Sequence, residues 1–278
     1  MNFISAGKDS SGRQVKLFYQ DWGHGKPVVL IHGWPVTSAM WEYQSAELPK
    51  HGLRVVAYDR RGFGQSSKPW NGYDYDSFAD DLKHLLDELD LQDVMLVGFS
   101  MGGGEICRYM SRHKGARVAR VALVGAVPPF LLKTADNPEG VDHSVFDGII
   151  DGIDKDRPDF LGNFGKLFFG VGVVGTTVSD ATLQWTTNLA MQASHRATVE
   201  CVRAWSATDF RKDLASITVP TLIIHGDNDS TVPAAISADR MAKALPKAEY
   251  KRYKDAPHGL YVTHKDELTR DLAVFAKG

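Results

Sequence analysis

Short runs rich in β-branched residues recur along this chain, and most of them are apolar over their whole length. They lie at residues 28–31, 54–58, 94–97, 118–124 and 221–224. A strand whose successive side chains are all apolar is covered on both faces, which is typical of strands inside a parallel sheet. Helical patterns fill the stretches between the runs, and this alternation favours right-handed crossovers. The sequence therefore predicts an α/β fold built around a parallel sheet.

One helical pattern between two of these runs is especially regular. Its apolar side chains recur on one helical face: Phe78, Leu82, Leu85, Leu86 and Leu89. Ser77 and Asp80 are placed as the N-cap and the acidic residue of the first turn. We therefore expect a helix capped by Ser77.

The alternation stops between about residues 128 and 212, where no strong strand signal occurs. Aromatic side chains are frequent there: Phe130, Phe146, Phe160, Phe164, Phe168, Phe169, Trp185, Trp205 and Phe210. Glycines break the helical patterns: Gly162, Gly165, Gly170, Gly172 and Gly175. We expect short helices that form a lid. The predicted organisation is a core in two parts, residues 1–127 and 214–278, interrupted by a helical cap insert at residues 128–213.

The composition excludes several classes of function. A net charge of −2 offers no positive surface that would attract nucleic acid or an anionic membrane. The two cysteines, Cys107 and Cys201, do not make a disulfide framework or a zinc site. Residues 1–12 lack the pattern of a signal peptide, and no apolar run is long enough to span a bilayer. We expect a cytoplasmic protein with no nucleic-acid, membrane or metal partner.

Ser100 is the first candidate for chemistry. It lies between Gly98 and Gly102, directly after the run at residues 94–97 and before a helical pattern. A nucleophilic serine on a sharp strand-to-helix turn requires small neighbours two residues away on each side, because the backbone there is crowded. The alternative is a glycine-rich turn with an inert surface serine. The strand, turn and helix together favour the nucleophile.

A serine nucleophile requires a base, and the base requires an orienting carboxylate. His258 follows a late strand-like run at residues 248–253 and is the only histidine in a glycine-flanked loop of this kind. Asp227 and Asp229 follow the run at residues 221–224 and therefore lie at the same edge of a parallel sheet as Ser100. Asp227 is nearer the strand end, where a carboxylate often only binds loop amides. We favour Asp229 and keep Asp227 as the alternative.

Two backbone N–H groups are candidates for an oxyanion hole. One belongs to Met101, directly after the serine, at the N-terminus of the expected helix. The other belongs to Trp34, in the loop after the run at residues 28–31. Trp34 is alternatively a packing aromatic, and the two roles are compatible because the backbone donates while the indole lines a pocket.

Several stretches in order resemble one family. They are residues 32–35, 58–67, 98–105, 125–129, 225–229 and 255–259. They are similar to the α/β-hydrolase family, and within it to the cofactor-free haloperoxidase, perhydrolase and arylesterase branch, over nearly the whole chain. The resemblance implies an eight-stranded, mostly parallel sheet under a helical cap. It also implies a catalytic triad of Ser100, Asp229 and His258, with Trp34 and Met101 as oxyanion donors.

The resemblance further implies a serine esterase or perhydrolase that acts on small carboxylic esters through an acyl-enzyme and uses no cofactor. Halogenation is then a side reaction in which a released peracid oxidises halide. A lactonase or γ-lactamase is the nearest alternative, and a triad-bearing ligand receptor is the alternative from another class. Relatives of this kind often self-associate, so the resemblance also allows a homo-oligomer. We expect a small apolar pocket with five wall residues: Trp34, Pro35, Phe99, Val127 and Val232.

Pro35 generates a prediction about the second half of the reaction. Proline fixes its own φ and keeps Trp34 out of the α region, which sets the direction of the Trp34 carbonyl. If that carbonyl faces the site, it accepts a hydrogen bond from hydrogen peroxide; otherwise Pro35 only stiffens the loop. Pro35→Leu should lower the ratio of perhydrolysis to hydrolysis, measured with one ester in the presence and absence of peroxide. An unchanged ratio contradicts the role.

Overall fold

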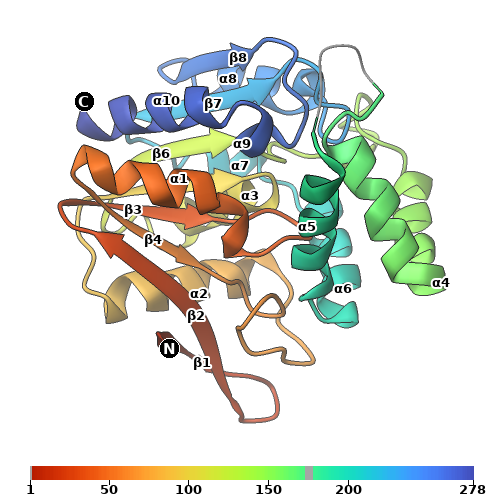
Figure 1. The fold of residues 1–278 in the computed structure, drawn as a ribbon, viewed down its shortest axis with the longest axis horizontal. Coiled ribbons are helices and arrows are strands. Elements are labelled where there is room, and N and C mark those ends of the chain that lie inside the picture. Colours follow the sequence, from red (N-terminus) through yellow and green to blue (C-terminus); the bar gives the residue numbers. More distant parts are fainter. Residues whose placement is uncertain (1, 173–177) are drawn as a thin grey trace.

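The computed structural model describes residues 2–172 and 178–278, so Gly175 lies outside the described residues. Eight strands form one sheet in the order β1-β2-β4-β3-β5-β6-β7-β8 (Figure 1). Their bounds are β1 Phe3–Lys8, β2 Gln14–Gly23, β3 Lys26–Ile31, β4 Leu53–Tyr58, β5 Val94–Phe99, β6 Val118–Val124, β7 Thr221–Gly226 and β8 Glu249–Tyr253. Strand β2 is antiparallel to β1 and β4, and all other pairs are parallel. The predicted eight-stranded, mostly parallel sheet is confirmed.

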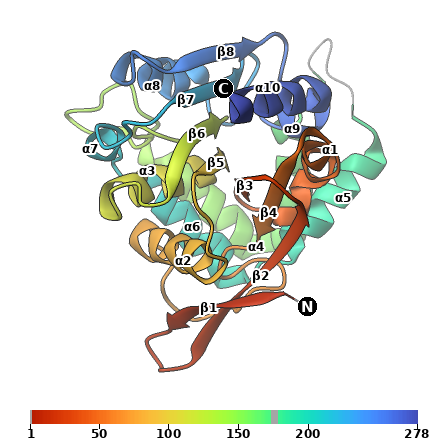
Figure 2. The same cartoon turned by 90° about the vertical axis from the view of Figure 1, so that its left-hand side faces the viewer.

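The apolar runs form the central strands because helices cover both of their faces. Every residue of β5 and of β7 is buried. Helices α2 (Tyr75–Glu88), α3 (Met101–Arg112) and α8 (Ala238–Ala244) pack on one face, and α1 (Glu42–Glu47), α9 (Leu260–Thr263) and α10 (Lys265–Lys277) pack on the other. Figure 2 shows α2 and α3 on one side of the strands and α1 and α10 on the other. The short 3₁₀ turns are η1 Ser38–Trp41, η2 Leu48–His51 and η3 Ala234–Ile236.

Helix α2 begins one turn earlier than predicted, so the expected cap is wrong. Its N-cap is Asp74, whose side chain accepts a hydrogen bond of 2.9 Å from the Ser77 backbone N–H. Ser77 is therefore inside the helix and donates to the cap. The predicted start of the helix was too late because the apolar pattern was counted from Phe78, whereas Tyr75 is also buried in the same helix.

Helices α4 (His143–Phe168), α5 (Asp180–Met191), α6 (His195–Ala207) and α7 (Arg211–Leu214) come between β6 and β7, and we propose that they belong to the cap insert. The expectation that glycines break the helical pattern is wrong at Gly162 and Gly165, because both lie within the second part of α4. The helix is interrupted only at Asp156, where φ is −158° and ψ is 89°. Asp156 Oδ1 accepts a hydrogen bond of 3.1 Å from Asp159 N, so this residue caps the second half of α4. None of the helices in the described residues is both long and apolar enough to cross a membrane.

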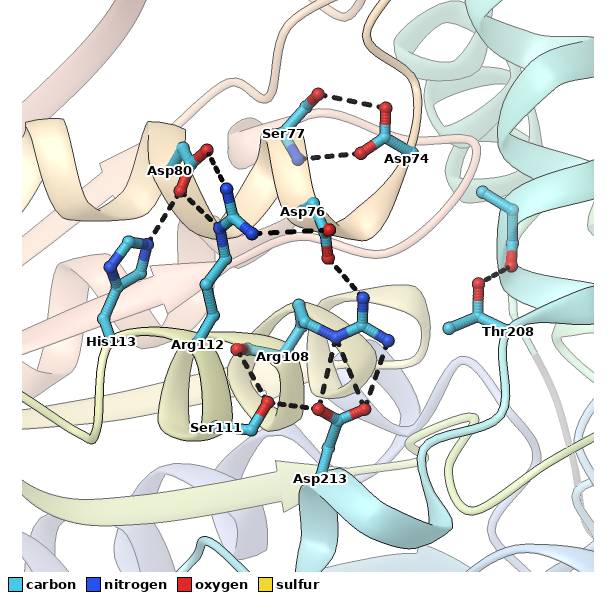
Figure 3. A network of polar contacts seen from close by, with 11 residues as sticks. Asp74, Asp76, Ser77, Asp80, Arg108, Ser111, Arg112, His113, Thr208 and Asp213 are labelled. Atoms are coloured by element: carbon cyan, nitrogen blue, oxygen red, sulfur yellow. Dashed lines mark hydrogen bonds and ion pairs between the residues drawn. The ribbon is translucent and has the colours of Figure 1, made fainter.

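A network of charged side chains ties α7 to the core helices (Figure 3). Arg108 of α3 forms an ion pair of 3.2 Å with Asp213 of α7 and a second ion pair with Asp76 of α2. Arg112 of α3 pairs with Asp80 of α2 at 2.7 Å. Each pair is partly exposed, so each contributes little stability by itself. Together they fix the place where the chain returns from the proposed cap to β7.

A fully buried ion pair joins the end of β4 to α3. Arg60 Nε donates a hydrogen bond of 2.7 Å to Glu105 Oε2, and neither residue has any exposed surface. Tyr58 donates its hydroxyl hydrogen bond to the other Glu105 oxygen, and Arg60 Nη2 donates one of 2.9 Å to the His32 carbonyl. Burial raises the pKa of the Glu105 carboxyl, and the Arg60 charge opposes this shift. The pair therefore holds β4, α3 and the turn after β3 together.

Removing one charge from this pair should destabilise the fold strongly. Glu105→Gln keeps the shape but leaves the buried Arg60 charge uncompensated, so we expect the free energy of unfolding to fall by about 3–5 kcal/mol. Lys83→Met is the matched control, because it breaks the exposed pair of Lys83 with Asp87 and should cost less than about 1 kcal/mol. Denaturant unfolding of both variants provides the measurement. Equal losses in the two variants contradict the structural role of the buried pair.

Candidate active site

Ser100 occupies a strained turn between β5 and α3. Its φ of 52° and ψ of −116° place it where residues with a side chain are rarely found. The flanking glycines permit the turn: a Cβ on Gly98 would lie 2.5 Å from the Gly102 carbonyl oxygen, and a Cβ on Gly102 would lie 2.7 Å from the Ile31 carbonyl oxygen. A hydrogen bond of 2.9 Å from Ser100 N to Val124 O holds the turn against β6. The serine is thus presented at the carboxyl edge of the sheet, as the sequence predicts.

A chain of hydrogen bonds connects Ser100 to His258 and Asp229. Ser100 Oγ lies 3.0 Å from His258 Nε2, and His258 Nδ1 lies 2.6 Å from Asp229 Oδ2. An ionised carboxylate only accepts hydrogen bonds, so Nδ1 carries the ring proton and Nε2 accepts the hydroxyl proton of Ser100. All three residues are buried. The arrangement allows the imidazole to take a proton from the serine.

The structure places Asp229 next to His258, whereas Asp227 lies outside the site. Asp227 is exposed, whereas the side chain of Asp229 is completely buried. Asp229 Oδ1 accepts hydrogen bonds of 3.0 Å from Thr231 N and 2.8 Å from Val232 N. Burial raises the pKa of the Asp229 carboxyl, but electrostatic attraction to His258 and hydrogen bonds from His225 and His258 outweigh this effect and hold that pKa well below its usual value. The carboxylate is therefore ionised in the folded protein.

Aromatic rings enclose His258 from two sides. The centroid of Phe99 lies 4.8 Å from the imidazole, and that of Phe168 lies 4.9 Å away with its plane at 90°. Phe168 is the last residue of α4, so the proposed cap contacts His258 directly. Phe168 was expected only as one of the aromatic residues of the cap. Its spacing of four residues from Phe164, and of eight from Phe160, was the available signal for a shared helical face.

A largely apolar cavity of about 380 Å³ opens beside Ser100. The residues that line it are Trp34, Ser100, Met101, Val127, Leu131, Val141, Val145, Phe146, Ile149, Phe160, Asn163, Phe164, Leu167, Trp205, Ser230, Thr231, Val232, Ile236 and His258. No aspartate, glutamate, lysine or arginine is among these described residues. Nor do the described residues include a group of three or more His, Cys, Asp or Glu side chains that could hold a metal ion. The cavity therefore suits an uncharged ligand.

Three of the five expected wall residues line the cavity, and two lie elsewhere. Trp34, Val127 and Val232 are in the wall, whereas Pro35 and Phe99 are outside the described lining. The expectation for Phe99 is wrong, because its side chain belongs to the core on the face of the sheet covered by α1 and α10. The centroid of its ring lies 6.3 Å from that of Trp41 in this core.

Trp34 fulfils the packing role and keeps its backbone next to the serine. Its indole Nε1 donates a hydrogen bond of 2.9 Å to the Thr198 carbonyl in α6. A Cβ on Gly33 would lie 3.0 Å from Ser100 Cβ, so the turn that carries Trp34 touches the serine turn. Within the described chain, neither Trp34 N–H nor Met101 N–H is bonded to a protein acceptor. Both donors are thus available to a ligand.

The chain matches one family model and several known proteins along most of its length. Residues 26–163 and 176–265 match the family model described as the alpha/beta hydrolase fold. The chain is 47% identical over 276 residues to a putative non-heme chloroperoxidase of a Synechocystis species, covering 99% of both chains. It is 37% identical over 267 residues to the bifunctional esterase/perhydrolase DCH of Acinetobacter calcoaceticus, covering 95% of this chain and 96% of that protein.

Comparison with solved structures agrees with the sequence matches. A bromoperoxidase from Bacillus anthracis is similar with a TM-score of 0.95 and 45% identity, covering 100% of this chain and 99% of that one. An esterase from Exiguobacterium antarcticum is similar with a TM-score of 0.92 and 33% identity over the same shares of the two chains. In fold, in the matched family model and in full-length identity, the chain belongs to the α/β-hydrolase family.

Proposed function

We propose that this protein is a serine ester hydrolase in which Ser100, His258 and Asp229 form a catalytic triad. The supporting observation is a hydrogen-bond chain that begins at Ser100, in the wall of an apolar cavity, and runs through His258 to the buried, ionised Asp229. His258 takes the hydroxyl proton while Ser100 Oγ attacks the ester carbonyl carbon. The N–H groups of Trp34 and Met101 bind the resulting oxyanion. His258 then gives the proton to the departing alcohol, leaving an acyl-enzyme on Ser100.

Water or hydrogen peroxide completes the cycle. His258 removes a proton from the incoming water or peroxide, and the oxygen of that molecule attacks the acyl carbon. The bond between the acyl carbon and Ser100 Oγ then breaks, and His258 returns the proton to Ser100 Oγ. Water yields a carboxylic acid and peroxide yields a peracid. Relatives described as an esterase/perhydrolase and as non-heme chloroperoxidases support both outcomes. The peracid can oxidise a halide ion in solution and return to the acid, which requires no group bound to the protein.

The cavity favours small esters with neutral, apolar groups. Its wall carries no ionisable carboxylate, ammonium or guanidinium among the described lining residues, so a charged substrate group would lose its hydration without a partner. Aromatic side chains from α4 and α6, including Phe146, Phe164 and Trp205, offer surfaces for acyl or aryl groups. Aryl and short-chain alkyl esters therefore fit this proposal.

Replacing the nucleophile tests the proposal directly. Ser100→Ala should lower kcat for a chromogenic short-chain ester by about 10⁶-fold, because acyl transfer to the enzyme is abolished. Alanine at a position with positive φ also retains the strain of the turn, so circular dichroism and an unfolding curve serve as folding controls. A folded variant that keeps substantial activity refutes Ser100 as the nucleophile.

A pair of matched substitutions tests the acid. Asp229→Asn keeps the side-chain shape but removes the charge that holds the required tautomer of His258, so kcat should fall by about 10⁴-fold. Asp227→Asn changes an exposed carboxylate two residues away and should leave kcat unchanged. Steady-state kinetics with the same ester distinguish the two. Loss of activity in the Asp227 variant alone would transfer the acidic role to that residue.

A further inference from the structure

A second histidine, His225, lies against the carboxylate of Asp229. It belongs to β7, and its side chain has no exposed surface. His225 Nε2 lies 2.7 Å from the Val232 carbonyl oxygen and 3.2 Å from Asp229 Oδ2. No ligand-binding or catalytic role described above uses this residue.

The surroundings of His225 determine where its proton lies. Both groups next to Nε2 are acceptors, so Nε2 carries the hydrogen; the Val232 carbonyl oxygen is the nearer acceptor and Asp229 Oδ2 the second, longer acceptor of the same hydrogen. His225 Nδ1 is buried and has no hydrogen-bond partner among the described residues. A second proton on Nδ1 would leave a buried donor unpaired, which is costly. The geometry therefore gives a neutral ring with its hydrogen on Nε2.

We propose that His225 is a positioning residue, which holds the Asp229 carboxylate in the orientation that receives the His258 N–H; this inference rests on the proposed function. The backbone N–H groups of Thr231 and Val232 bind Asp229 Oδ1, at 3.0 and 2.8 Å. The other oxygen, Oδ2, lies 2.6 Å from His258 Nδ1 and 3.2 Å from His225 Nε2. Donors on both oxygens remove the rotational freedom of the carboxylate. Without His225, His258 would be the only donor at Oδ2, and the carboxylate would be held against rotation only by the two backbone N–H groups on Oδ1.

The second contact of His225 links the acid to the cavity. Its hydrogen bond to the Val232 carbonyl fixes the segment from Asp229 to Val232, and the last three residues of this segment line the cavity. A purely structural role would consist of this loop contact alone. The proposed role also requires that His225 act through Asp229, and this difference can be measured.

Two substitutions separate donation from bulk. His225→Leu fills the space but donates nothing, whereas the amide nitrogen of His225→Gln reaches the place of Nε2 and still donates. For a short-chain aryl ester we expect His225→Leu to lower kcat by about 10²-fold through misplacement of the catalytic groups, with little change in KM. His225→Gln should recover most of this loss. Equal loss in both variants, or a wild-type kcat in His225→Leu, overturns the proposal.

A double-mutant cycle asks whether the effect passes through Asp229. If it does, His225→Leu should add almost nothing to the loss in kcat caused by Asp229→Asn. A further 10²-fold or similar loss in that background, of about the same size as in the wild type, shows an independent role and overturns the proposal. The proposed function fails separately, if Ser100→Ala retains activity in the same assay.

The ring proton can also be observed without any substitution. In ¹⁵N-labelled wild-type protein, nuclear magnetic resonance should show His225 with hydrogen on Nε2 and none on Nδ1. Hydrogen on Nδ1 alone would mean that Nε2 cannot donate to Asp229, and this result overturns the proposal whether or not the variants fold.

Discussion

The proposed active site depends on a backbone turn whose φ and ψ angles are rarely adopted by residues with a side chain. Ser100 has a positive φ, and a residue held in such a region costs about 1–3 kcal/mol. The surrounding structure over-determines the turn: β5 is paired on both sides, and α3 approaches the sheet so closely that Gly98 and Gly102 have no space for a side chain. The buried pair of Arg60 with Glu105 adds a polar connection to the same helix. The position of the proposed nucleophile is therefore a property of the packed core.

Strand order then decides which loops reach Ser100. Strand β3 neighbours β5, so the turn with Gly33 and Trp34 lies against the serine turn. The loops after β7 and β8 start further along the sheet and have to extend back over its edge. They support each other: Asn228 N donates a hydrogen bond of 3.1 Å to Ala256 O, and a Cβ on Gly226 would lie 2.1 Å from that oxygen. This contact joins the loop that carries the proposed acid to the loop that carries the proposed base.

The central strands and the placement of Ser100 could be predicted because their signals are local. Apolar runs and a glycine-flanked serine can be recognised within a few residues, whereas β2, next to the edge strand β1, has exposed and half-buried residues among its buried ones and gave no continuous run. The predicted N-cap of α2 and the predicted breaks at Gly162 and Gly165 in α4 were wrong, because helix boundaries depend on side-chain hydrogen bonds and on packing against other elements. Phe168 and Glu105 contact residues distant in the chain, such as His258 and Arg60, and no local pattern reveals such pairs. Phe99 was wrongly expected in the cavity wall, because its side chain lies, like that of Val97, in the core on the face of the sheet covered by α1 and α10.

The proposed cap and the proposed triad are mechanically connected. Phe168, at the end of α4, packs on the His258 ring, and Gly259 N donates a hydrogen bond of 2.8 Å to the Phe168 carbonyl. Trp34 is held through its indole by the Thr198 carbonyl of α6, so a proposed oxyanion donor is also tied to a helix of the proposed cap. The helices that line the cavity thus also contact the proposed base and one proposed oxyanion donor. A substitution in α4 that displaces Phe168 will therefore also change the packing around His258.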